Sequence, residues 1–324
     1  MNAIVVHRFG DPDVLQLEEL PDPMPGPRQV RVKVSAVGVN PYDTYMRAGG
    51  YAINPPLPYT PGADAAGVID RVGEAVSGFT IGDRVYVGGT AQSNAYGAYA
   101  SLVVCDPHQV HPLPSQVSFP QGAAVNVPYA TAWRALFGRA AARAGDTVLI
   151  HGASGGVGIA ATQLARAAGL IVVATAGTEE GLALVVAQGA HHALDHRSDG
   201  YLATLTDLTG GRGPDVILEM LANVNLDHDL GVIARGGRIV VVGNRGRVEI
   251  DPRKIMSRDS SVFGLVLWTV QDQELSRAHM AIGAGLANGA LRPVVGRELP
   301  LAEARRAHEL VREAGARCKI VLVP

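Results

Sequence analysis

A glycine-rich turn between an apolar strand and a helix constrains the fold of this chain most strongly. A strand is predicted over 147–151, and a helix is predicted over 157–168. Between them, Gly152, Gly155 and Gly158 follow the pattern G-x-x-G-x-x-G. Glycines in this place allow a sharp turn, a close approach to a pyrophosphate and tight packing of the helix on the sheet. The turn therefore predicts a dinucleotide site, with the phosphates at the helix N-terminus.

Strands and helices alternate along the central part of the chain. Further strands are predicted over 170–174, 215–219, 238–242 and 261–266. Helices are predicted between them, over 179–188, 199–208 and 226–234. This alternation is typical of an α/β fold with a doubly wound parallel sheet, so we expect a central Rossmann domain. A helix over 121–137, kinked or restarted at Pro128, is expected to lead into it.

The first 120 residues are rich in short strands with Gly and Pro turns. Apolar and polar residues alternate from Val30 to Ser35, as in a half-buried strand. These patterns favour a partly closed β-barrel, and the tail after Trp268 is expected to return to it. We therefore predict one domain from 1–122 and 268–324, and a second from 123–267.

Composition indicates a globular enzyme. Of the 324 residues 47% are hydrophobic and 18% are charged, and the formal net charge is −2. The sequence has no dense run of Lys and Arg that would indicate nucleic-acid binding. Two cysteines form no disulfide framework and fit a reducing compartment. The N-terminus lacks the pattern of a signal peptide and no apolar run suggests a membrane span, so a cytoplasmic location is expected.

The end of the second strand indicates which dinucleotide is bound. An NAD site usually has a carboxylate there for the ribose 2′-hydroxyl, but Thr175–Thr178 contains none. Gly177 and Thr178 leave room for a 2′-phosphate, so NADPH is expected. The cationic candidates for this phosphate are His196, Arg197, Arg312 and Lys319. Glu179 and Glu180 would repel it if they turned inward; we prefer to place them in the first turn of the next helix.

Other cofactor contacts are expected where parallel strands end. The phosphate-binding residues are Gly152, Ser154, Gly155, Gly156, Val157 and Gly158. The candidates on the nicotinamide side are Asn225, Gly243, Asn244, Leu265, Val266 and Leu267. Ordinary turn chemistry explains Asn225, Gly243 and Asn244 equally well.

Six stretches over nearly the whole chain resemble one family. They are Gly38–Tyr45, Leu57–Gly62, Gly82–Val85, His151–Gly158, Ala176–Gly181 and Glu219–Asn225. The chain resembles the zinc-independent medium-chain dehydrogenase/reductases, and among them the ζ-crystallin-type NADPH:quinone oxidoreductases. The resemblance implies a GroES-like catalytic domain made of both chain ends, a Rossmann domain, and a cleft between them.

The resemblance also predicts that no metal is bound. Zinc-dependent members have Cys, His-Glu and Cys at three positions, where this chain has Asn40, Ala63-Asp64 and Asn126. Catalytic zinc needs three side-chain ligands of N, S or O type. We therefore expect neither a zinc ion nor alcohol dehydrogenase chemistry.

Asn40, Tyr45 and Tyr51 are the catalytic candidates. Asn40, Pro41 and Asp43 fit the start of a helix, so Asn40 either caps this helix or also donates to a substrate carbonyl. The resemblance places Tyr45 and Tyr51 near the nicotinamide and the substrate, and Tyr45 is also a cofactor candidate. A tyrosine ring can stack on a flat quinone and bind its oxygen.

The predicted activity is NADPH-dependent quinone reduction, with transfer from C4 of the nicotinamide to a flat conjugated acceptor. One- and two-electron transfer both stay open. The alternative enzyme is a 2-alkenal or enone reductase, and the alternative of another class is an AU-rich RNA-binding or crystallin-like structural role. The 261–266 strand is expected at the sheet edge, where the resemblance suggests pairing into a homodimer; a homotetramer is the other option.

Overall fold

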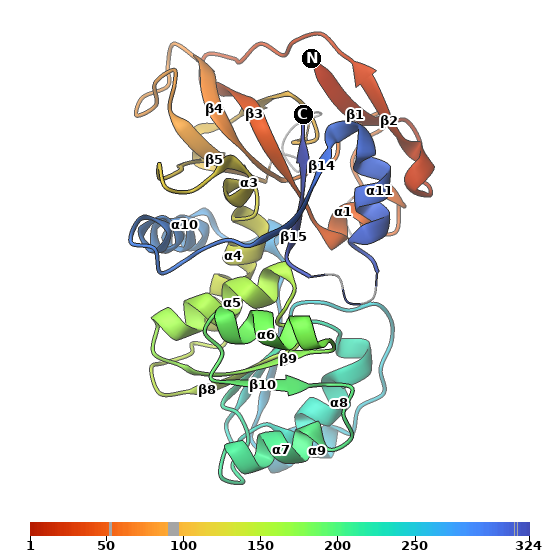
Figure 1. The fold of residues 1–324 in the computed structure, drawn as a ribbon, viewed down its shortest axis with the longest axis vertical. Coiled ribbons are helices and arrows are strands. Elements are labelled where there is room, and N and C mark those ends of the chain that lie inside the picture. Colours follow the sequence, from red (N-terminus) through yellow and green to blue (C-terminus); the bar gives the residue numbers. More distant parts are fainter. Residues whose placement is uncertain (52–53, 90–96, 314, 316) are drawn as a thin grey trace. The chain divides into compact units, whose positions relative to one another are not determined.

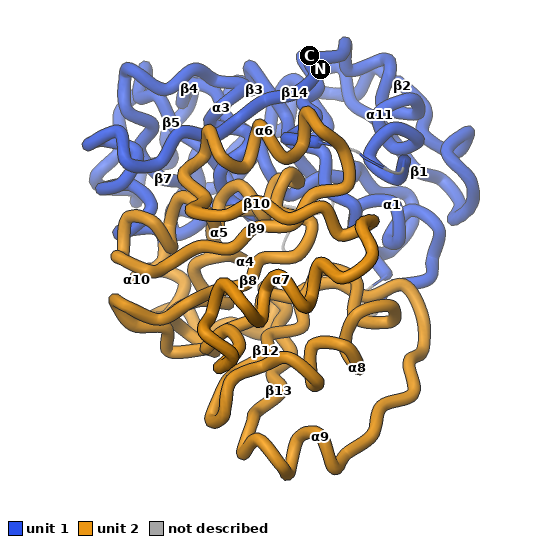
Figure 2. Tube along the Cα trace, turned by 60° about the horizontal axis from the view of Figure 1, so that its bottom comes forward, with its two compact units in different colours: residues 1–127, 279–324 blue, residues 128–278 orange. Residues whose placement is uncertain are grey.

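The computed structural model describes residues 1–324 except 52–53, 90–96, 314 and 316 (Figure 1). The chain forms two compact units (Figure 2). Unit 1 comprises residues 1–127 and 279–324, and unit 2 comprises residues 128–278. The boundaries between the units therefore lie at 127/128 and 278/279. The sequence predicted these boundaries at 122/123 and 267/268, which is five and eleven residues earlier.

Side-chain hydrogen bonds explain why the segments next to both boundaries, after residue 127 and up to residue 278, belong to unit 2. The Arg134 guanidinium donates to Glu274 Oε1 at 3.0 Å and to the carbonyl oxygen of Val266. The Tyr129 hydroxyl donates to Gln163 Oε1 at 2.7 Å. Buried charged and polar groups need such partners, so the segment up to residue 278 stays with the nucleotide-binding fold.

Unit 2 contains a six-stranded sheet in which every recorded strand pair is parallel. In spatial order its strands are β10 (His192–Asp195), β9 (Ile171–Ala176), β8 (Thr147–Ile150), β11 (Val216–Glu219), β12 (Arg238–Val241) and β13 (Ser261–Gly264). This order confirms the doubly wound sheet and the edge position of β13. β10 was not predicted, because it is a short, largely polar edge strand with no apolar run.

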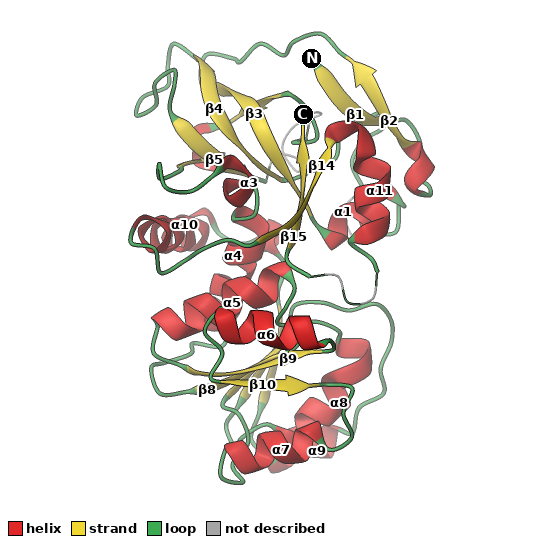
Figure 3. Cartoon of the chain, in the orientation of Figure 1, coloured by secondary structure: helices red, strands yellow, loops and turns green. Residues whose placement is uncertain are grey.

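Helices cover both faces of this sheet (Figure 3). α5 (Gly156–Ala167) and α6 (Glu179–Ala187) lie on one face, and α7 (Tyr201–Leu208), α8 (Ala222–Val232) and α9 (Pro252–Ser257) lie on the other. Leu149, Ile217 and Ile239 are fully buried in the core beneath α7 and α8. Burial on both faces explains why these strands are continuous apolar runs.

Unit 1 is built from a twisted antiparallel sheet and a small hairpin. The sheet order is β14 (Val295–Pro300), β15 (Lys319–Val323), β3 (Val30–Val39), β4 (Asp64–Val72), β5 (Arg84–Gly88) and β7 (Val110–Pro112). Among the strand pairs of the described residues in this sheet, β14 and β15 are parallel and the others are antiparallel. β6 (Leu102–Cys105) also pairs with β3, and β1 (Asn2–Val6) pairs with β2 (Leu15–Glu19). Strand β15 thus joins the chain end to β3, as the sequence predicted.

Short helices complete the fold. In unit 1 these are α1 (Pro41–Arg47), α3 (Phe119–Gly122) and α11 (Ala304–Leu310). The helix predicted over 121–137 is instead α3, a break, α4 (Asn126–Trp133) and a π-helical stretch (Arg134–Arg139). α10 (Asp272–Ala287) carries the chain back to unit 1. Among the described helices, none has both the length and the apolar character of a membrane span.

Candidate functional site

The loops that follow the strands of unit 2 gather most of the predicted cofactor residues at one edge of the sheet. Because all these strands run parallel, their carboxyl ends lie on the same side. The strand order reverses between β8 and β11, which is the switch point where such sheets bind ligands. The predicted residues that follow these strand ends are Gly152–Gly158, Gly177, Thr178, His196, Arg197, Asn225, Gly243, Asn244 and Leu265–Leu267.

The glycine turn at the end of β8 leaves open space where a phosphate would approach. Gly155 is the N-cap of α5, and a Cβ built on it would meet only the Gly152 carbonyl oxygen, at 3.4 Å. A Cβ on Gly158 would lie 2.4 Å from Ala153 Cα, so Gly158 is needed for packing. The first N–H groups of α5 have no acceptor within the helix. This arrangement fits a pyrophosphate held by backbone N–H groups and the helix dipole.

Gly177, His196 and Arg197 lie together beyond the end of β9. A Cβ on Gly177 would lie 2.8 Å from both Arg197 Nε and His196 Nε2. The Thr178 hydroxyl caps α6 by accepting from the Gly181 N–H at 3.1 Å, and Glu179 and Glu180 are exposed in the first turn. Burial lowers the pKa of His196, so the cation here at neutral pH is Arg197.

Arg312 and Lys319, the other two phosphate candidates, belong to unit 1. The guanidinium carbon of Arg312 lies 5.0 Å from the centre of the Tyr45 ring, as in a cation–π pair. The Lys319 ammonium is buried and binds Asp64 and Asn40. The expectation that Lys319 binds the 2′-phosphate is therefore corrected, since this ammonium is already paired inside unit 1.

The loops after β11 and β12 bind each other. The Ala222 N–H donates to the Gly243 carbonyl at 3.0 Å, and the Arg245 N–H donates to Asn223 Oδ1 at 2.9 Å. A Cβ on Gly243 would lie 2.3 Å from the Met220 carbonyl oxygen, so only glycine fits there. The Asn225 side-chain amide donates to Glu219 Oε1 at 3.2 Å. Turn packing thus explains Gly243, and Asn225 binds the end of β11.

In unit 1, Asn40, Asp64, Asn126 and Lys319 form one buried group, which we call the Asp64 cluster. Asp64 Oδ2 accepts from Asn40 Nδ2 at 3.0 Å and from Lys319 Nζ at 2.7 Å. Its Oδ1 accepts from Asn126 Nδ2 and from the Val127 N–H, each at 3.0 Å. The Lys319 ammonium also donates to Asn40 Oδ1 at 2.5 Å. Four donors thus satisfy the carboxylate fully.

The Asp64 cluster does not fit a zinc ion. It brings together the positions where zinc-dependent relatives were expected to carry ligands, but it offers one carboxylate and two amides. Zinc prefers Cys, His and carboxylate ligands, and a lysine ammonium already lies against this carboxylate. The prediction of metal-free chemistry is therefore supported by the amide and ammonium groups that already occupy the Asp64 carboxylate.

Asn40 begins α1, as predicted, but its side chain has another role. Asp43 Oδ2 accepts from the Asn40 backbone N–H at 2.9 Å, which closes the first turn. The Asn40 amide is 2% exposed, and its oxygen and nitrogen bind Lys319 and Asp64. Asn40 is thus the N-cap of α1 and forms a capping box with Asp43, as predicted, while its side-chain amide in addition links Lys319 to Asp64. Burial raises the pKa of Asp43 to about 7, against the lowering effects of the Asn40 N–H and Lys319.

An aromatic group is formed by Tyr42 and Tyr45, which lie on α1, and by Tyr51, which follows α1 in the sequence. The ring centres of Tyr42 and Tyr51 lie 5.9 Å apart in a stacked pair, and those of Tyr45 and Tyr51 lie 6.1 Å apart. Burial, together with the charge of Asp43, raises the pKa of Tyr51 to about 12. Its hydroxyl therefore keeps its proton and is a hydrogen-bond donor.

This fold and the glycine turn define a dehydrogenase or reductase with a nucleotide-binding domain and a GroES-like domain. The family model described as zinc-binding dehydrogenase matches residues 156–282, and the alcohol dehydrogenase GroES-like domain matches residues 26–115. The quinone oxidoreductase of Lama guanicoe is 48% identical over 100% of this chain and 97% of that protein.

Solved structures agree with this class. The Escherichia coli quinone oxidoreductase in complex with NADPH is 29% identical, with a TM-score of 0.89 over 100% of both chains. An NAD-dependent alcohol dehydrogenase is 30% identical, with a TM-score of 0.93 over 100% of both chains. The chain belongs to the quinone oxidoreductase family of the medium-chain dehydrogenase/reductases.

Two features of these sites were not predicted from the sequence. Lys319 was not predicted as the partner of Asp64, although it is the first residue of the buried apolar strand β15, where a charge needs a partner. His151, Glu219 and Asp229, which lie within 4.8 Å of one another, were not recognised as a group. Polar residues at the ends of two buried strands would have been the signal for His151 and Glu219.

Proposed function

We propose that this chain is an NADPH-dependent quinone oxidoreductase that works without a metal. The observation that supports this most is the open space at Gly155, next to a helix N-terminus. In the same unit β9 ends at Ala176 and is followed by Gly177 and Thr178 rather than by a carboxylate, and His196 and Arg197 lie against Gly177. The kinship with quinone oxidoreductases over the full chain supports the acceptor class.

Different residues of unit 2 bind different parts of the cofactor. Ser154–Val157 hold the pyrophosphate through backbone N–H groups and the Ser154 hydroxyl. Arg197 and the neutral His196 bind the 2′-phosphate, as charge-assisted and neutral donors respectively. Asn225, Gly243, Asn244 and Leu265–Leu267 form the nicotinamide side. When NADPH is bound it supplies the hydride, and the protein supplies orientation.

In unit 1, the tyrosines of α1 and Tyr51 offer a surface for a flat acceptor. Tyr45 and Tyr51 stack on the acceptor and donate to its oxygens. Arg312, which lies over the Tyr45 ring, adds positive charge beside them. Asn40 acts as a positioning residue, because its amide links Lys319 to Asp64 and its backbone anchors Asp43.

We further propose a cytoplasmic homodimer that forms through β13. This strand is an edge of the six-stranded sheet, and Ser261, Val262 and Gly264 are exposed. An unpaired edge with an exposed valine can pair with a second copy. Light scattering should give twice the mass of the chain, and Val262→Pro should give a monomer. A Val262→Pro variant that keeps the wild-type mass would remove β13 from the interface. Both cysteines are free, which fits the reducing cytoplasm.

Turnover distinguishes this function from its nearest alternative. The purified chain should oxidise NADPH with 9,10-phenanthrenequinone as acceptor, and far more slowly with a 2-alkenal of similar concentration. Preferred turnover of the alkenal would replace quinone reduction with enone reduction. Turnover of neither acceptor would contradict both enzymatic proposals.

A further inference from the structure

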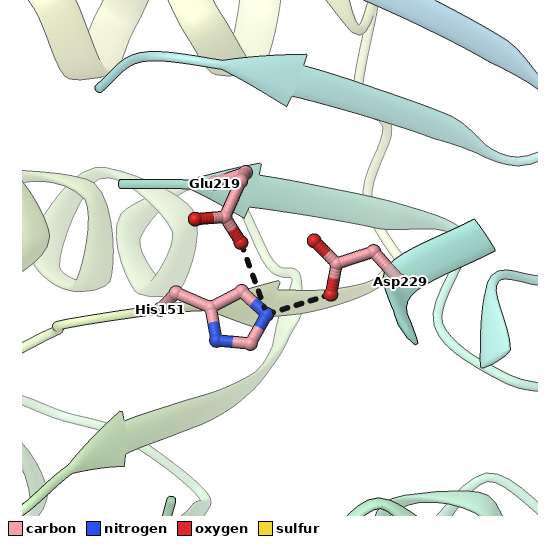
Figure 4. A group of neighbouring side chains, drawn as sticks. All are labelled: His151, Glu219 and Asp229. Carbon is pink, nitrogen blue, oxygen red and sulfur yellow. Dashed lines mark hydrogen bonds and ion pairs between the residues drawn. The ribbon is translucent and has the colours of Figure 1, made fainter. Parts of the chain in front are cut away.

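His151, Glu219 and Asp229 form a buried cluster at the switch point of the sheet (Figure 4). His151 follows β8, Glu219 ends β11, and Asp229 comes from α8. His151 Nε2 lies 2.8 Å from Asp229 Oδ1 and 3.5 Å from Glu219 Oε2. The imidazole side chain is 4% exposed, and both carboxylates are 0% exposed.

This cluster carries more negative than positive charge unless it holds an additional proton. A doubly protonated His151 contributes +1 and two carboxylates contribute −2, which leaves −1. The other titratable groups that face it come from the segment after β10, namely His196 and Tyr201. Burial lowers the pKa of His196, and Tyr201 is neutral, so neither supplies a charge. A buried uncompensated charge is costly.

The hydrogen bonds show where an additional proton would reside. Glu219 Oε2 and Asp229 Oδ2 have no hydrogen-bond partner among the described residues. Ionised carboxylate oxygens only accept, whereas a protonated one donates. A single proton between these two side chains would satisfy a buried oxygen on each and neutralise the cluster.

The cluster also connects two loops of the nucleotide site. His151 directly precedes Gly152, the first residue of the glycine turn. Glu219 Oε1 accepts from the Leu221 N–H and from the Asn225 amide at 3.2 Å. Glu219 therefore contacts both loops: it pairs with the His151 imidazole next to the glycine turn, and it orients the loop after β11 through Leu221 and Asn225.

We propose that the His151–Glu219–Asp229 cluster is a positioning element of the nucleotide site, and that NADPH binds tightly only while the two carboxylates share one proton. The proposal rests on the proposed cofactor site at this edge of the sheet. Loss of the shared proton leaves two anions in contact, which separates Glu219 from Asp229 and shifts Asn225 and the glycine turn with them.

The electrostatics place this transition near neutral pH. Burial, partly offset by the charge of His151, raises the pKa of Glu219 to about 7. Burial alone would lower the pKa of His151, but the hydrogen bond and charge of Asp229 and the charge of Glu219 raise it. Below pH 7 a proton is therefore retained on Glu219, beside an imidazole whose pKa is itself raised. Affinity for the dinucleotide should therefore be greatest below pH 7 and fall above it.

A divalent metal fits this cluster less well than a proton. Two ligands of a tetrahedral zinc at about 2.0–2.1 Å each lie about 3.3 Å apart. The 2.8 Å between His151 Nε2 and Asp229 Oδ1 is a hydrogen-bond distance, shorter than the spacing of two ligands on a tetrahedral zinc.

The test is the pH dependence of dinucleotide affinity. Calorimetric titrations between pH 6 and 9 would give the dissociation constants of NADPH and NADH for the wild-type protein, Glu219→Gln and Asp229→Asn. NADH separates the cluster from the 2′-phosphate, which titrates near pH 6. Glu249→Gln is the matched control, because Glu249 is an exposed glutamate of the same unit. Thermal unfolding would verify that each variant is folded.

For the wild-type protein and Glu249→Gln, both dissociation constants should rise by up to about tenfold per pH unit above pH 7. The amide of Glu219→Gln mimics the protonated carboxyl, so its affinity should match wild type at pH 6 and stay constant to pH 9. Asp229→Asn should flatten the profile in the same way.

Three outcomes would overturn the proposal. They are a pH-independent wild-type affinity, a wild-type pH profile in both amide variants, and a profile that chelation shifts and zinc restores. The last would identify a metal site. A wild-type protein that binds neither dinucleotide even at pH 6 would instead refute the proposed function, and the proposal would fall with it.

Discussion

The ammonium nitrogen of Lys319 lies 2.7 Å from Oδ2 of Asp64 in the interior of unit 1. The two side chains are 4% and 0% exposed, so this pair is removed from water. It joins the last strand of the chain to the start of β4. The ammonium group of Lys319 thus lies among the residues that replace the expected zinc ligands, and it balances the charge of Asp64.

Removal of this cation should destabilise the protein strongly. Lys319→Met leaves Asp64 buried without its counter-charge, and loss of one partner of a buried pair costs about 3–5 kcal/mol. The free energy of unfolding from urea titration should fall by this amount. Lys254→Met is the control, since the Lys254–Asp227 pair is 36% and 34% exposed and exposed pairs contribute at most about 1 kcal/mol. Equal losses for the two variants would contradict the importance of burial.

The two glycines of the turn should respond to substitution in different ways. Gly155→Val places its side chain in open space, so NADPH affinity should fall at least about a hundredfold, while the free energy of unfolding changes by about 1 kcal/mol or less. Gly158→Ala forces a Cβ to within 2.4 Å of Ala153 Cα, so it should lower stability by about 1–3 kcal/mol. Fluorescence titration and urea unfolding separate the two effects. Unchanged NADPH affinity in Gly155→Val would refute the phosphate assignment.

Arg197 should distinguish NADPH from NADH. Arg197→Ala removes a charge-assisted bond of about 1.5–3 kcal/mol, so the dissociation constant of NADPH should rise about ten- to hundredfold while that of NADH stays unchanged. Arg212→Ala, at an exposed arginine of the same unit, should alter neither. If Arg197→Ala weakens both dinucleotides equally, Arg197 does not bind the 2′-phosphate.

Asp43 should make stability depend on pH. Its pKa is about 7 in the folded protein and 3.8 in the unfolded reference, so the folded state binds the proton more tightly between these values. The stability from this group is present below pH 4 and is lost as pH rises through 7, with an upper limit of about 4 kcal/mol. Asp43→Asn cannot titrate, so its unfolding free energy should fall less from pH 5 to pH 8. Parallel curves for the two proteins would contradict the raised pKa.

The sequence predicted the sheet of unit 2 well because its signals are local. The apolar strands before Gly152 and Gly243 and the glycine spacing depend on residues close together in the chain. The edge position of β13 followed from the same alternation. β10 was not predicted because His192–Asp195 is largely polar. The 121–137 helix was wrong because α3 ends at Gly122 and α4 begins only at Asn126, whereas the sequence pointed to an interruption at Pro128.

The sites depend on contacts distant in sequence, which no local pattern reveals. Lys319 and Asn40 are 279 residues apart, and Lys319 and Asp64 are 255 apart. The sequence marked Asn40, Asp64 and Asn126 as related only through the family resemblance, and it assigned Lys319 to a phosphate because a free cation was assumed. His151 and Asp229 are 78 residues apart and meet only when the sheet forms.

The rate of NADPH oxidation with 9,10-phenanthrenequinone, before and after exhaustive chelation, tests metal-free quinone reduction most directly. We predict the same turnover in both preparations, with substoichiometric zinc by elemental analysis of the chelated protein. Loss of turnover on chelation and its recovery on addition of zinc would contradict the account.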